Sequence, residues 1–208
     1  MDHRVTILRR DRGFSVVELV IVLAVVLIVI AIAIPTMKTV IDAYRLDASG
    51  HAVASLLQQT RILAVKTNTP YYAQFDTTIT PNRIYANTDQ SAFQTGNSSV
   101  TVDGDVSFQT AGLPDHTQLD ALMSNGNASA AATVSGAIGF NARGLPCVEQ
   151  GGNPAVCTQP GNAANYFEWF MQDASNGGWE AVTVTPAGRI KAWRLGSASG
   201  CGYPACWQ

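Results

Sequence analysis

The sequence predicts an α+β fold in which one long N-terminal helix packs, through its C-terminal half, against antiparallel β-sheets. Three observations lead to this prediction: an unbroken apolar run near the N-terminus, an amphipathic stretch after it, and many short β-rich segments separated by Gly, Pro, Asn and Ser. The chain has 208 residues, enough for one domain of ordinary size. Only 13% of them are charged, against about a quarter in typical soluble proteins. Part of the apolar composition is therefore expected to serve a membrane.

The first predicted element is a membrane-spanning helix over residues 14–35. Leu19–Ile34 contains sixteen apolar residues without interruption. A helix over Phe14–Ile34 would be about 31 Å long, close to the roughly 30 Å of a bilayer's hydrocarbon core. Residues 1–13 carry four arginines against two aspartates. The positive-inside rule then predicts a cytoplasmic N-terminus, an exported C-terminal region and a single pass through the membrane.

A carboxylate lies near the start of this apolar segment. At the centre of a spanning helix Glu18 would cost about 2.5–3.5 kcal/mol, and less near an end, so a neutralising partner is expected. Residues 32–36 offer no convincing small-residue cleavage site, so a cleaved secretory signal is not favoured. An uncleaved signal anchor is the plainer alternative, and Glu18 argues against it.

The residues around this carboxylate form a motif. Arg12-Gly13-Phe14-Ser15-Val16-Val17-Glu18-Leu19 resembles the class III signal of type IV pilins and type II secretion pseudopilins. The resemblance implies that residues 1–13 are a leader peptide, that a membrane prepilin peptidase cuts between Gly13 and Phe14, and that Phe14 is then N-methylated. The new amine of Phe14 would lie one helical turn from Glu18. Glu18 is therefore expected to pair with its own or a neighbouring subunit's terminus and to set the register of filament assembly.

The second predicted element is an amphipathic helix over residues 36–67 that continues the first. Members of the resembled family often carry a proline where Pro35 stands; it removes a helical hydrogen bond, which loosens or kinks the stem in the filament. Asn68-Thr69-Pro70 ends the helix. One apolar stripe at helical spacing is expected to lie under a sheet: Val53, Leu56, Leu57, Thr60, Leu63 and Ala64.

The exported region, residues 68–208, is predicted to be rich in β-structure. A hairpin is expected at Pro186-Ala187-Gly188, and two low-complexity surface loops are expected over residues 110–132 and 145–165. The predicted strands are Tyr71–Asp76, Arg83–Ala86, Val100–Val102, Val106–Gln109, Thr133–Asn141, Tyr166–Gln172, Trp179–Thr185 and Arg189–Leu195.

The helix and the β-rich region together resemble the pilin-like architecture. Within that superfamily, Ala64–Lys66, Ile138–Gly144 and Val182–Ile190 resemble the GspH/FimT group of minor pseudopilins and minor pilins. The resemblance implies a structural, non-enzymatic subunit of a type II secretion system or a type IV pilus. Its partners would be prepilin peptidase, other pilins or pseudopilins and the inner-membrane platform protein, and it would pass from the inner membrane into a filament or its tip.

All four cysteines lie after residue 146. None forms a CxxC pair with partnering histidines, so two disulfides in an oxidising compartment are favoured over a metal site. Three pairings are open. Joining Cys147 to Cys157 and Cys201 to Cys206 closes the shortest loops, for about 2–3 kcal/mol each in the chain-entropy model.

No catalytic, metal or cofactor site is predicted. The three histidines are His3 in the leader, His51 on the helix and His116 in a loop beside Asp115, and none has the spacing of a hydrolase or metal motif. A membrane-anchored periplasmic enzyme is therefore the least favoured function.

A DNA-binding role in uptake is the other alternative. Gly188-Arg189-Ile190-Lys191 is similar to the Gly-Arg-x-Arg type motif with which FimT-like minor pilins hold DNA, which makes Arg189, Lys191 and the nearby Arg194 candidate DNA contacts. Residues 14–208 contain nine basic and thirteen acidic residues, net −4, so few phosphates could be neutralised. A solvated strand face is the plainer interpretation.

Overall fold

The structure is a computed structural model of the chain. It describes residues 14–124, 132–133, 136–150, 152–158, 166–196, 201–203 and 205–208. The chain divides into two compact units, residues 1–40 and 41–208. Helix α1 (Val16–Thr67) contributes its first half to one unit and its second half to the other.

The described part of the first unit is helical and apolar. By length and composition, α1 is able to cross a membrane, and its apolar window is exposed among the residues that the structure describes. The side chains from Leu19 to Ile34 are exposed, apart from the half-buried Ala33. The backbone is helical at Pro35, so this proline lies inside the helix.

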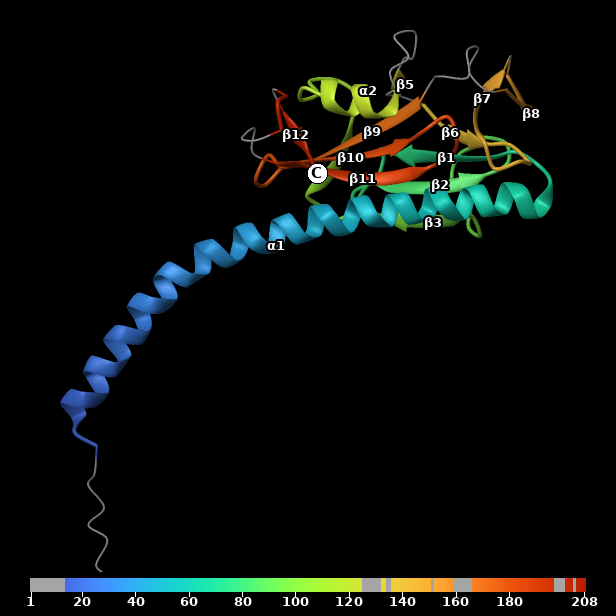
Figure 1. Ribbon diagram of the computed structural model, residues 1–208. Coiled ribbons are helices and arrows are strands. Elements are labelled where there is room, and N and C mark those ends of the chain that lie inside the picture. The colour runs from blue at the N-terminus through green and yellow to red at the C-terminus, as the bar shows by residue number, and fades with distance from the viewer. Residues whose placement is uncertain are drawn as a thin grey trace, which may run out of the picture. The chain divides into compact units, whose positions relative to one another are not determined.

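The second unit contains two six-stranded sheets and one short helix (Figure 1). The first sheet is made of β1 (Tyr71–Asp76), β2 (Arg83–Asn87), β3 (Ser98–Thr101), β6 (Ile138–Phe140), β7 (Pro146–Gln150) and β8 (Asn153–Thr158). The second is made of β4 (Val106–Gln109), β5 (Ala132–Thr133), β9 (Tyr166–Asp173), β10 (Trp179–Val184), β11 (Ile190–Gly196) and β12 (Cys206–Trp207). Helix α2 (Thr117–Met123) lies beside the second sheet.

Strand order brings distant parts of the chain together. The first sheet runs β3-β2-β1-β6-β7-β8 and the second β12-β11-β10-β9-β4, with antiparallel neighbours throughout; the short β5 pairs parallel with β9. The long helix on two antiparallel sheets confirms the predicted α+β fold.

The main core lies between α1 and the sheets. The predicted stripe on α1 is confirmed: Val53, Leu56, Leu57, Thr60 and Ala64 are buried, and Leu63 is half-buried. A second core covers the opposite face of the second sheet; its members are Leu119 and Met123 of α2, Tyr166 and Phe170 of β9, Ala181, Trp193 and Trp207. Alternation along β9 therefore directs Phe167, Trp169 and Met171 toward the main core and the residues between them toward α2.

The two predicted surface loops contain regular structure. Helix α2 lies in the first, because Leu119 and Met123 are four residues apart and bury one apolar face. The β7–β8 hairpin lies in the second. Both elements are too short, and too rich in small or polar residues, to show a periodic apolar pattern.

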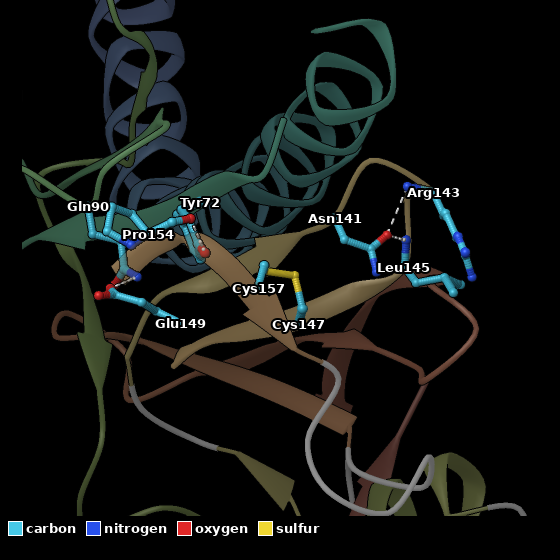
Figure 2. Close-up of a disulfide and its surroundings, with 9 residues drawn as sticks. All are labelled: Tyr72, Gln90, Asn141, Arg143, Leu145, Cys147, Glu149, Pro154 and Cys157. Carbon is cyan, nitrogen blue, oxygen red and sulfur yellow. Dashed lines mark hydrogen bonds between the residues drawn. A yellow bond between two sulfur atoms is a disulfide. The ribbon is translucent and has the colours of Figure 1, made fainter. Parts of the chain in front are cut away.

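The hairpin is held by a disulfide between Cys147 and Cys157 (Figure 2). It packs on Gly139 of β6, where a Cβ atom would lie 2.8 Å from Cys157 Sγ and 2.6 Å from Cε1 of Tyr72. The Tyr72 hydroxyl donates a 2.8 Å hydrogen bond to the carbonyl of Pro154, and burial raises the pKa of Tyr72 to about 12. The second disulfide joins Cys201 to Cys206, so the structure contains the two local pairings.

Candidate functional site

The candidate processing site lies at the start of α1. Phe14 and Ser15 precede the helix, Phe14 is 72% exposed, and the first helical bond runs from the Leu19 amide to the Ser15 carbonyl at 3.1 Å. Glu18 is in the first turn of α1 and exposed, and no ion pair joins it to any residue that the structure describes. Gly13 lies outside the described residues.

A comparison with protein-family models identifies the N-terminal segment. Residues 8–34 match the prokaryotic N-terminal methylation motif. The chain carries a class III prepilin-type signal. Followed by a long N-terminal helix, this signal is consistent with a type IV pilin-like protein. It indicates a pilin-type structural protein rather than a known class of enzyme, and it implies processing by prepilin peptidase and assembly with other pilins. No curated protein and no solved structure matched the chain.

Outside the signal, the two glycine-containing turns that resemble the GspH/FimT group meet at one arginine of α1. Nη1 of Arg61 donates a 2.9 Å hydrogen bond to the carbonyl of Gly188. Gly188 has φ +80°, and a Cβ there would lie 2.9 Å from the carbonyl oxygen of Gly144. Each turn closes by a backbone bond, from the Gly144 amide to Asn141 and from the Gly188 amide to Thr185. Arg61 is therefore hydrogen-bonded to the turn at Gly188 and lies close to the turn at Gly144, where a Cβ atom would lie 3.1 Å from its Nε.

The three candidate DNA contacts do not share one surface. Arg189 is exposed at the β10–β11 turn and lines a groove with Arg61 and Lys66 of α1. Lys191 lies with its ammonium 3.4 Å from the ring centroid of Trp193, a cation–π contact. Arg194 is exposed, and alternation along β11 places it on the opposite face from Lys191. The structure therefore separates these three cations.

Three ionisable side chains converge between α2 and β9. Nδ1 of His116, the residue before α2, lies 3.2 Å from Oδ2 of Asp120 and 3.4 Å from Oε2 of Glu168. Glu168 is fully buried, and neither of its carboxylate oxygens has a hydrogen-bond partner within the described ranges. Burial, and then the nearby Asp120 carboxylate, raises the pKa of Glu168 to about 8.

Sequence reasoning considered His116 alone and did not single out Asp120 or Glu168. The His116–Asp120 pair has the i,i+4 spacing of neighbours on a helix face, but such pairs are common on surfaces. Glu168 lies on a distant strand and reads as an outward residue between Phe167 and Trp169. Only the packing of α2 on the second sheet brings the three together.

A second buried carboxyl group lies between α1 and the second sheet. Glu180 of β10 is 1% exposed and faces Gly50 of α1, where a Cβ atom would lie 1.7 Å from Glu180 Oε1. Burial chiefly, and Asp47 secondly, raise the pKa of Glu180 to about 9, while Arg194 opposes the shift. The missing side chain at Gly50 therefore makes room for the Glu180 carboxyl group.

Proposed function

We propose that this chain is a structural minor pilin or minor pseudopilin that prepilin peptidase processes and that assembles into a filament of a type IV pilus or a type II secretion system. The methylation motif at residues 8–34 carries this proposal. In this proposal, residues 1–13 are the leader, residues 14–35 span the inner membrane and residues 36–208 lie in the periplasm. The subunit is then assembled into the filament together with other pilins by the platform protein.

The chemistry of the N-terminus supports assembly. Cleavage before Phe14 creates a cationic amine four residues from Glu18, on the same helical face. In a low-dielectric helical bundle an unpaired carboxylate is costly, and a neighbouring subunit's amine removes that cost. The exposed apolar side chains from Leu19 to Ile34 give each subunit a surface that either lipid or other pilin helices cover.

The minor-subunit assignment rests on the exported unit. The segments Ile138–Gly144 and Val182–Ile190, which resemble the GspH/FimT group, form the two turns that lie close to Arg61 of α1. The contact gives those glycine residues a structural role, because a side chain at either position would collide with Arg61 or with the other turn.

Mass spectrometry of the membrane-extracted protein tests the proposal. We expect a chain of 195 residues that begins with N-methylated Phe14, when the protein is produced together with a prepilin peptidase. Replacing Gly13 with a bulky residue, as in Gly13→Phe, should leave the leader attached, whereas Gly13→Ala should still be cut because alanine is small. An intact Met1 in the wild-type protein, or a terminus after Ala33, would refute the proposed processing.

A further inference from the structure

We propose that His116, Asp120 and Glu168 form a binding site for a divalent transition-metal ion such as Zn²⁺. The three candidate ligand atoms, one from each side chain, lie within 4.8 Å of one another. Ligands held at about 2.0–2.1 Å around tetrahedral zinc are about 3.3–3.4 Å apart. The two distances from His116 Nδ1, 3.2 and 3.4 Å, agree with that separation.

The buried carboxylate is the observation that points to a ligand. Glu168 is fully buried beside Asp120, a second acid, and its oxygens have no hydrogen-bond donor among the described residues. Nδ1 of His116 lies near both acids without forming a hydrogen bond to either. Burying such a group without compensation is unfavourable by several kcal/mol. A metal ion bonded to all three groups supplies the missing positive charge.

The donors select the class of ion. One imidazole nitrogen with two carboxylate oxygens suits zinc and its first-row neighbours, whereas calcium takes six to eight oxygen ligands. The His116 and Asp120 side chains are 29% and 36% exposed, so the cluster lies near the surface of this unit, with Glu168 at its buried side. The Tyr166 hydroxyl donates a hydrogen bond to Asp120 Oδ1, which orients the carboxylate and leaves Oδ2 facing His116.

The ion would link α2, which covers the second core, to strand β9. Asp120 belongs to α2 and His116 is the residue before it, while Glu168 belongs to strand β9. The same short segment holds β12, because Gln118 Oε1 accepts a 2.6 Å bond from the Trp207 amide and the Asp115 carbonyl accepts a 2.9 Å bond from Trp207 Nε1. Metal binding is therefore expected to raise the melting temperature of the exported unit.

The test uses the full chain, purified in detergent without a histidine tag and stripped of metal with a chelator. Titration with ZnCl₂ in a calorimeter should show one ion per chain and a higher melting temperature by tryptophan fluorescence. His116→Ala and Glu168→Gln should each weaken Zn²⁺ binding more than 100-fold. His51→Ala is the matched control, because His51 and Asp47 have the same i,i+4 spacing but are exposed, 3.9 Å apart and without a third ligand. It should bind Zn²⁺ like the wild type.

A spectroscopic arm covers the case in which a variant fails to fold. Co²⁺ added to the stripped wild-type chain should produce visible absorption bands of a four- or five-coordinate site, and an equivalent of Zn²⁺ should abolish them. Absence of stoichiometric Zn²⁺ binding by the wild type would overturn the proposal. So would Zn²⁺ binding of undiminished affinity in folded His116→Ala and Glu168→Gln chains, since the ion would then bind elsewhere.

Discussion

Glu18 belongs to the prepilin-type signal and is also an acidic residue at the start of an apolar helix. Its carboxylate lies in the first turn of a helix whose following turns are apolar, and its side chain is exposed. Among the described residues of the same chain no cation pairs with it, so its partner in our proposal is a terminal amine at Phe14. In that proposal, the carboxylate gains its partner when subunits associate.

Replacing this charge separates insertion from assembly. We expect Glu18→Val to insert and be processed as well as the wild type, because the substitution removes the cost of a charge in the bilayer. Its amount in sheared filaments should fall at least tenfold, measured by immunoblot against the membrane pool. The neighbouring Val17→Ala, also on the exposed helix surface, is the control and should assemble normally. Wild-type incorporation of Glu18→Val would contradict the register role.

At the scale of elements, the interface between α1 and β10 is unusual because it contains a carboxyl group. Gly50 weakens a helix by about 1 kcal/mol relative to alanine, yet α1 continues through it and Glu180 fills the space. The carboxyl group faces Asp47 and Arg194 as its charged neighbours. Since like charge and burial both favour the protonated form, this interface is most stable when Glu180 is neutral.

This interface makes folding stability depend on pH. With a folded pKa of about 9 against 4.5 for the ordinary group, Glu180 keeps its proton in the folded chain while the unfolded chain releases it. Its contribution is therefore complete below pH 4.5 and declines as pH rises toward 9, by about 1.4 kcal/mol per pH unit. Glu180→Gln should reduce that decline, followed by tryptophan fluorescence during chemical unfolding of the full chain in detergent.

The control for this experiment is Glu149→Gln, which changes a half-buried carboxylate of β7. It should leave the pH dependence of the unfolding free energy as in the wild type. All four tryptophans lie after residue 168, so their signal reports on the unit of residues 41–208 and not on the apolar half of α1. Equal slopes in the wild type and Glu180→Gln would show that Glu180 titrates normally in the folded protein.

The sequence predicts an element well when local periodicity determines it, and poorly when tertiary contacts do. The buried stripe of α1 and the strands β1 and β4 follow from local periodicity, and the sequence predicts them closely. Helix α2 and the β7–β8 hairpin depend on tertiary contacts, two apolar residues in one case and a disulfide in the other. The His116–Asp120–Glu168 cluster is of the same kind, because sequence spacing does not reveal which strand packs beside α2.

At the scale of the whole molecule, acidic residues outnumber basic ones, and several of the basic side chains already contact other residues. Residues 14–208 carry a net charge of −4. Arg61 is bonded to Gly188 and Lys191 is stacked on Trp193, so both have structural contacts. Arg45 forms ion pairs with two aspartates: its Nε lies 3.7 Å from Asp103 Oδ2, and its Nη1 lies 3.9 Å from Asp105 Oδ2. The unit that contains the two sheets therefore has little cationic surface with which to hold a polyanion.

The charge distribution predicts weak DNA binding at best. At about 0.15 M salt we expect the full chain in detergent to give no shift of duplex DNA in a gel assay, because the two exposed cations of the groove beside Arg61, Arg189 and Lys66, release few counterions. At low salt any shift should have a shallow log–log salt slope, near −0.9 for each phosphate contacted. Lys66→Ala with Arg189→Ala should abolish it, and Arg194→Ala, at the opposite end of β11 beside Glu180, should not. A strong shift at 0.15 M salt that this double substitution removes would instead assign the groove beside Arg61 to DNA uptake.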